Sequence, residues 1–198
     1  DRLVTAPDRA FLKGVRVPRA DRQRDFADAI LLDISGSMVQ RGFPTRKFDR
    51  LVDAAVLFIE IHERLKIPYE VLSFSTEAHV HWSFDRCQWT STRIDAVGRY
   101  TPKDHSEIFR RMYRLDHRDT DDAGAVRTAS RDALKQRGLK SLLVVTDGIS
   151  SDPATLRRVL SDIERCNRNA PEEQQLRVLA FGVGVVRSEF ESAYVPRE

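Results

Sequence analysis

The segment Ala29-Ile30-Leu31-Leu32-Asp33-Ile34-Ser35-Gly36-Ser37 joins a continuous apolar run to a turn rich in side-chain oxygens. A segment of the same kind, Leu142-Leu143-Val144-Val145-Thr146-Asp147-Gly148, follows much later in the chain. Continuous apolar runs are typical of strands in a parallel sheet that is covered on both faces. In open α/β sheets, ligands bind in the crevice outside the carboxyl ends of the strands. We therefore expect Asp33 and Asp147 to lie together in one such crevice.

Between and beyond these two segments, strand-like and helix-like patterns alternate. Strand patterns cover residues 28–33, 69–75, 78–82, 140–146 and 176–183, and apolar residues recur at helical spacing over 48–65, 107–113 and 121–135. Asp152-Pro153 predicts the start of a further helix, with an N-cap acid followed by Pro at the first helical position. The alternation predicts an α/β fold, namely a three-layer, doubly wound, mostly parallel sheet.

The chain length and the N-terminal composition predict one domain with an extension. A chain of 198 residues fits a single domain, because domains typically contain roughly 100–200 residues. Residues 1–25 mix Arg, Asp and Pro without periodicity, and we interpret them as an N-terminal extension or linker. Residues 26–198 are then expected to form the folded domain.

The overall composition argues against two classes of partner. The 33 Lys and Arg residues nearly balance the 30 Asp and Glu residues and are spread along the chain, so no nucleic-acid partner is expected. No apolar run approaches the roughly 18 residues of a membrane span, so no membrane partner is expected either. Cys87 and Cys166 are far apart, and we interpret them as buried free thiols of a cytoplasmic protein, with a single disulfide as the alternative.

The two turns supply ligands suited to a hard cation. Asp33, Ser35, Ser37 and Asp147 carry carboxylate and hydroxyl oxygens, which suit Mg²⁺, Mn²⁺ or Ca²⁺ rather than zinc or copper. Mg²⁺ is the expected ion, because proteins usually hold it with one or two carboxylates together with waters. Two acids and neutral hydroxyls leave its coordination open, so an Asp or Glu of a partner protein is expected to complete it.

These residues resemble the metal-ion-dependent adhesion site of von Willebrand factor A domains, in which Asp-x-Ser-x-Ser follows the first strand and Asp-Gly follows a later one. The resemblance covers residues 26–186 and implies that Thr120, at a helix start, is a fifth metal ligand. It also implies that the short strand 78–82 is the antiparallel edge of the sheet. Within the family, the chain looks most like bacterial proteins that work with MoxR-type AAA+ ATPases, such as cobalt-chelatase and nitric-oxide-reductase-activation subunits. That resemblance implies an adaptor whose partner is the AAA+ ATPase or its client.

Each of these residues also has a structural interpretation. Asp33 and the two serines are also residue types that form backbone turns, and Thr120 is also a typical N-cap. Asp121 and Asp122 are expected to be first-turn acids favoured by the helix dipole, rather than a second metal position. We interpret His79 and His81, on one face of a strand, as solvated edge residues rather than metal ligands, because no third ligand lies at suitable spacing.

Two other functions remain as alternatives. A metal-dependent hydrolase would use the same ion, but none of the five histidines falls in the motif loops to act as a general base. The sequence contains no Gly-x-Ser-x-Gly nucleophile elbow and no P-loop. The other alternative is a metal-independent interaction module that binds through an exposed face with Trp82 and Trp89, which otherwise cover an edge.

Overall fold

The computed structural model describes residues 26–39, 47–86, 102–185 and 187–194. The elements run in the order β1 (Phe26–Asp33), α1 (Gly36–Val39), α2 (Lys47–Leu65), β2 (Tyr69–Phe74), β3 (Ala78–Trp82), α3 (Pro102–Arg114), α4 (Asp122–Leu134), β4 (Leu139–Thr146), α5 (Pro153–Asn169), β5 (Leu176–Gly182) and α6 (Arg187–Tyr194). The expected extension, residues 1–25, lies outside the described residues, as do Cys87 and Trp89.

The strands form one sheet in the order β3-β2-β1-β4-β5. All pairs are parallel except β2 and β3, which are antiparallel, so the expected antiparallel edge strand is confirmed. β1 pairs with both β2 and β4. The chain adds β2 and β3 on one side of β1, and β4 and β5 on the other, so the strand order switches direction between β1 and β4. We call this place the switch point of the sheet. The register aligns Asp33 with Phe74 and Leu32 with Val145, so the carboxyl ends of the three strands lie level.

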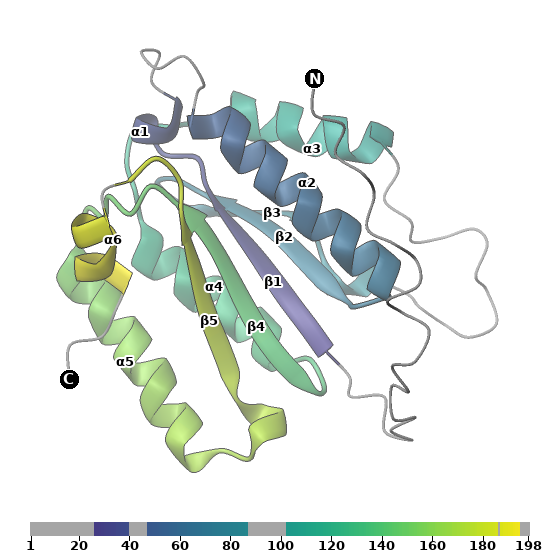
Figure 1. Cartoon of the computed structure of the whole chain (residues 1–198), viewed down its shortest axis with the longest axis vertical. Coiled ribbons are helices and arrows are strands. Elements are labelled where there is room, and N and C mark those ends of the chain that lie inside the picture. The colour runs from purple at the N-terminus through teal and green to yellow at the C-terminus, as the bar shows by residue number, and fades with distance from the viewer. Residues whose placement is uncertain (1–25, 40–46, 87–101, 186, 195–198) are drawn as a thin grey trace, which may run out of the picture.

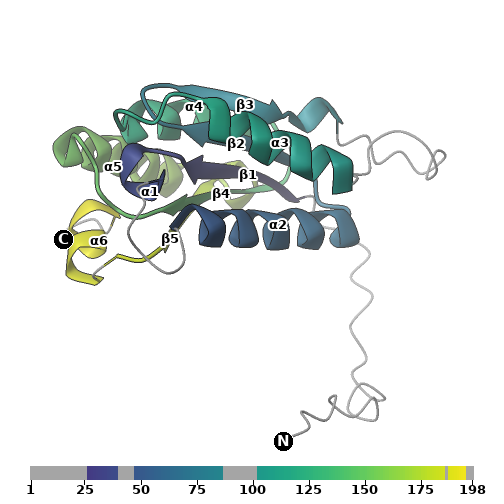
Figure 2. The ribbon, with the colours of Figure 1, turned by 90° about the horizontal axis from the view of Figure 1, so that it is seen from above.

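Helices cover both faces of the sheet, as the fold prediction requires. Figure 1 shows α2 on one face and α4 on the opposite face, and Figure 2 shows the layers from above. One core cluster joins β1 to α2 and α3 through Ile30, Leu51 and Met112. The other joins the opposite face to α4, α5 and α6 through Leu31, Val126 and Leu160. This arrangement confirms the three-layer, doubly wound α/β fold.

Local sequence signals explain where the helices begin and end. Asp152 is the N-cap of α5, its carboxylate accepting the Thr155 N–H at 3.0 Å, with Pro153 at the start of the helix, as predicted. Helix α2 ends at Leu65, and Lys66 then takes a positive φ of 57°. Helices α1 and α6 were not predicted, because α1 has only one turn and α6 has no clear apolar periodicity.

The structure corrects the expected exposure of Cys166 and His81 and decides between the two interpretations of Trp82. Cys166 is exposed, not buried, because it lies on the outer side of α5. Trp82 is buried and stacks on Tyr69 with ring centroids 6.3 Å apart, so it belongs to the core and not to an exposed binding face. His81 is half-buried, and its Nε2 lies 2.7 Å from Ser73 Oγ; burial lowers its pKa to about 4, so it is not a solvated edge residue.

No helix in the described part of the chain combines the length and the apolar character that crossing a bilayer requires.

Candidate metal centre

Asp33 is the last residue of β1 and is fully buried at the carboxyl end of the sheet. Its Oδ1 accepts the Ser35 N–H at 2.9 Å, and its Oδ2 accepts the Thr146 hydroxyl of β4 at 2.6 Å. The same Thr146 hydroxyl accepts the Gly148 N–H at 2.9 Å. The hydrogen bond between Thr146 and Asp33 therefore connects the ends of β4 and β1. Together with the Ser35 N–H, it fixes the orientation of the Asp33 carboxylate.

Burial also affects the charge of Asp33. It raises the pKa of this carboxyl to about 6, against the lowering effect of the hydrogen bonds from Thr146 and Ser35. The negative charge of Asp147 contributes a further small increase in the same pKa. An acid whose ionised form is disfavoured in this way gains from a cation placed beside it.

The two serines of the Asp-x-Ser-x-Ser segment lie side by side. Ser35 Oγ and Ser37 Oγ are 3.1 Å apart, across the start of α1. Gly36 lies between them where a β-carbon would come within 2.7 Å of the His117 carbonyl oxygen. Only glycine permits this close approach of the 117 loop to the serine turn.

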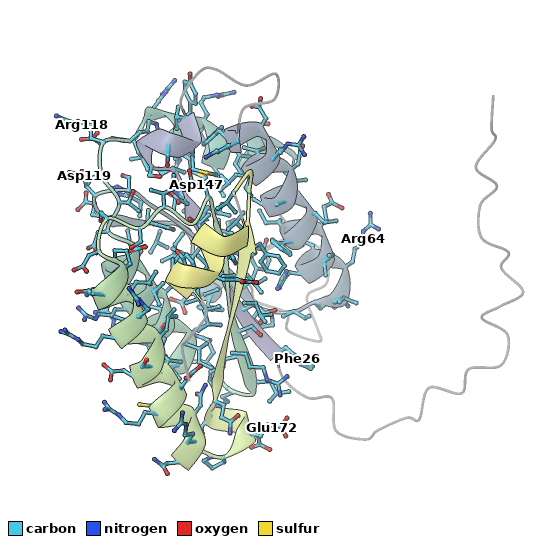
Figure 3. All side chains as sticks on the ribbon, turned by 60° about the vertical axis from the view of Figure 1, so that its left-hand side comes forward. Phe26, Arg64, Arg118, Asp119, Asp147 and Glu172 are labelled. Carbon is cyan, nitrogen blue, oxygen red and sulfur yellow. The ribbon has the colours of Figure 1, made fainter. Side chains whose placement is uncertain are left out.

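Asp147 follows β4 and is also fully buried. Its Oδ1 accepts a hydrogen bond from the Ile149 N–H at 3.2 Å, and its Oδ2 accepts one from the Lys47 ammonium at 2.9 Å. Gly148 continues the turn with φ of 76°, a conformation that favours glycine. Figure 3 shows Asp147 at the same end of the molecule as the loop that carries Arg118 and Asp119.

The loop that carries Thr120 is tied to the same edge by contacts on both sides. His117 Nδ1 lies 2.6 Å from the Ile34 carbonyl oxygen, and Asp121 N–H donates to the Ser75 carbonyl at the end of β2. The Ser151 hydroxyl donates to the carbonyl of Thr120, which is partly exposed. The structure thus brings the backbone of Thr120 to the edge that carries Asp33 and Asp147.

Thr120 is not the N-cap of α4. That role belongs to Asp121, whose carboxylate accepts the Gly124 N–H at 2.8 Å. Asp122 lies in the first turn of α4, as expected for an acid that complements the helix dipole. It is also buried, with 2% of its surface exposed, which the sequence did not predict.

Asp122 and Tyr194 lie beside this edge, a placement that sequence reasoning missed. Burial raises the pKa of Asp122, and burial together with the charges of Asp122 and Asp33 raises the pKa of Tyr194. The phenol of Tyr194 therefore lies close to both acids. A single sequence gives no signal for Tyr194, because it comes from α6, a helix without a detectable pattern.

The donor set fits a hard divalent cation. Two buried acids, two adjacent hydroxyls and the Thr120 loop converge on one edge, and a lysine ammonium already neutralises one of the acids. Among the described residues, no group of three or more His, Cys, Asp and Glu side chains is placed to hold a metal. A centre here would therefore depend on hydroxyl ligands, which suit Mg²⁺ better than a metal that prefers thiolate or imidazole.

Comparison with known proteins agrees with this architecture. The chain is similar to the conserved hypothetical protein BatB from Bacteroides thetaiotaomicron, with 14% identity, a TM-score of 0.50, and coverage of 79% of this chain and 66% of BatB. It is also similar to proximal thread matrix protein 1 from the mussel byssus, with 14% identity, a TM-score of 0.55, and coverage of 87% of this chain and 41% of that one. At such identities the likeness shows the fold only.

No curated protein matches the chain. The family model described as von Willebrand factor type A domain matches residues 29–150, which include both strand ends and the loop between α3 and α4. With the strand order and the antiparallel edge strand described above, this match places the chain in the von Willebrand factor type A family.

Proposed function

We propose that this domain binds Mg²⁺ through Asp33, Ser35, Ser37, Thr120 and Asp147, and that the bound ion recruits an acidic side chain of a partner protein. Mn²⁺ and Ca²⁺ are alternative ions for the same ligands. Domains of this family generally act as protein-interaction modules. The observation that carries the proposal is the convergence of Asp33 and the paired serines with Asp147 at the switch point of the sheet.

Each protein group would have a defined part in this site. The hydroxyls of Ser35 and Ser37, together with Thr120, would supply neutral ligands on one side of the site. Asp33 has both oxygens engaged by Ser35 and Thr146, so it would balance charge partly through water. Bound there, the ion would supply a Lewis-acid position open to a carboxylate from outside the molecule.

We propose that the partner is an AAA+ ATPase or the protein that it remodels, and that this domain is the adaptor between them in the cytoplasm. This part of the proposal rests on the resemblance to bacterial von Willebrand factor A proteins of the MoxR systems. A surface-exposed Asp or Glu on the partner is the chemical feature that the site would recognise.

Hydrolysis at this site is less well supported. His117 lies beside the site, but its Nδ1 and Nε2 lie 2.6 Å and 3.1 Å from the carbonyl oxygens of Ile34 and Tyr113. Because both ring nitrogens are directed at backbone carbonyl oxygens, neither is positioned to take a proton from a water molecule or substrate at the site. Turnover of a phosphoester panel with Mg²⁺ would favour the hydrolase over the adaptor.

The metal site is tested by isothermal titration of the wild-type chain with Mg²⁺, alongside Asp33→Asn and Asp162→Ala. Asp33→Asn keeps the shape of the side chain but removes one of two buried negative charges, so we expect Mg²⁺ affinity to fall by roughly 100-fold. Asp162 is an exposed acid on α5, and its substitution should leave the affinity unchanged. Equal binding by the wild type and Asp33→Asn would contradict the proposal.

A further inference from the structure

Lys47 occupies a position that its local surroundings disfavour. It is the first residue of α2, and a helix N-terminus carries partial positive charge, so a cation there is destabilising. The residue therefore needs a compensating partner from elsewhere in the fold. That partner is Asp147, one hundred positions away in the sequence, which accepts a hydrogen bond from the Lys47 ammonium at 2.9 Å.

The aliphatic stem of Lys47 packs against the turn that follows β5. A β-carbon at Gly184, in the turn after β5, would lie 3.3 Å from Lys47 Cγ and 3.4 Å from Cε, so the aliphatic stem packs closely against that turn. The side chain keeps 20% of its surface exposed, whereas that of Asp147 has none. The ammonium therefore reaches the buried acid from the solvent side, which gives it a route to withdraw.

The remaining oxygen of Asp147 is also engaged, because Oδ1 accepts the Ile149 N–H. With Lys47 in place, no oxygen of this acid is without a protein donor. A divalent cation that uses Asp147, directly or through a water molecule, must approach an oxygen that already holds a full positive charge. Two cations that share one carboxylate in a site shielded from solvent repel each other strongly.

We propose that Lys47 sets the affinity of this site for divalent ions, as an internal competitor for Asp147. This inference rests on the function proposed above and adds a control on it. When no ion is bound, the ammonium neutralises the buried charge of Asp147. When the ion binds, the ammonium leaves Asp147 toward solvent or shares it at reduced strength. The competition thus raises the ion concentration at which the site is half occupied.

The experiment compares Mg²⁺ titrations of the wild type, Lys47→Met and Lys135→Met. Methionine keeps an unbranched stem to pack against Gly184 but carries no charge. Lys135→Met removes the same charge from an exposed position where Lys135 pairs with Asp132, and so controls for net charge. We expect Lys47→Met to bind Mg²⁺ at least about tenfold more tightly than the other two proteins, because the competing charge is gone.

The outcomes separate this inference from the proposed function. If the wild type binds Mg²⁺ and Lys47→Met binds it equally or more weakly, the role of Lys47 is overturned and the metal site stands. If none of the three proteins binds Mg²⁺, the metal site itself is overturned, and the competitor role with it.

Thermal unfolding gives a second measurement that does not depend on titration heats. In EDTA, Lys47→Met should melt below the wild type, because the buried charge of Asp147 is left without a compensating positive charge. Saturating Mg²⁺ should raise the melting temperature of Lys47→Met more than that of the wild type. An equal rise in both proteins would overturn the competitor role. Lys47→Arg, which keeps the charge, should behave like the wild type and serves if Lys47→Met does not fold.

Discussion

At the scale of single residues, buried charged groups dominate the chemistry of this domain. Asp33 and Asp147 lie buried at the carboxyl ends of β1 and β4, while Glu70 lies in β2 with 4% of its surface exposed. Glu70 Oε2 has no hydrogen-bond partner among the described residues. Burial and the negative charge of Asp132 raise the pKa of Glu70 to about 7, against the opposing charge of Lys135. A buried acid of this kind makes stability depend on pH.

The direction of that dependence follows from the shift. The pKa of Glu70 is higher in the folded protein than in the unfolded chain, so folding favours the protonated form. Ionisation therefore costs stability as pH rises from about 4.5 to about 7, the unfolded and folded pKa values of this group. Below that window Glu70 has no effect, and above it the penalty is constant.

Glu70→Gln removes this penalty. In urea unfolding, we expect the variant to gain stability relative to the wild type by on the order of 2 kcal/mol between pH 5 and pH 8. Glu60→Gln, an exposed acid on α2, should show no such change across the same range. A stability difference between Glu70→Gln and the wild type that stays constant with pH would contradict the raised pKa of Glu70.

At the scale of elements, polar residues at the N-termini of helices stabilise those helices through capping hydrogen bonds. Asp152 caps α5 by accepting a hydrogen bond from the Thr155 N–H, and hydrogen bonds from the side chain and the backbone of Thr155 lower the pKa of Asp152. The cap satisfies a backbone donor that the helix itself leaves unpaired. The apolar face of α5, with Leu156 and Leu160, packs against the sheet.

Replacing Asp152 measures how much the N-cap of α5 stabilises the protein. Asp152→Ala should lower the unfolding free energy by about 1 kcal/mol, the usual loss for an N-cap acid replaced by alanine. Asp162→Ala, an exposed acid within the same helix, should cost less than half of that amount. Chemical denaturation of both variants at neutral pH measures the difference. Equal effects in the two variants would show that the cap adds nothing.

At the scale of the whole molecule, the level strand ends bring the candidate site residues to one edge of the sheet. β1 and β4 contribute the acids, and the loops from β2 and α3 bring the Thr120 segment to them. Glu172 and Phe26 lie at the opposite end of the molecule, as Figure 3 shows. A partner that binds through the ion would therefore contact the edge around Asp147 and leave the other end free.

Partner capture tests this expectation. Proteins retained from a lysate of the source cells by the immobilised chain should include a component that is held in Mg²⁺ and released by EDTA. Immobilised Asp33→Asn should fail to retain that component, because the ion that bridges the two proteins is lost. Asp162→Ala should retain it. Retention at full strength in EDTA would show that the partner binds a surface other than the proposed metal site.

Much of the fold and of the candidate site follows from the sequence. The apolar runs that end in Asp33 and Asp147 predicted two central strands, and the periodicity of α2 and the Asp152-Pro153 start of α5 were predicted close to their observed bounds. These features depend on interactions within a few residues, namely side-chain periodicity and capping. The local pattern alone therefore identifies the two acids and the two serines as candidate site residues.

Only the tertiary structure decided how distant residues meet. The Lys47–Asp147 pair, the hydrogen bond from Thr146 to Asp33 and the place of Tyr194 beside the acids all join segments far apart in the chain. The burial of Asp122 and the exposure of Cys166 depend on which side of a helix faces the sheet. A local pattern determines that a strand or helix forms, but long-range packing determines which polar groups lose solvent and which partners they find.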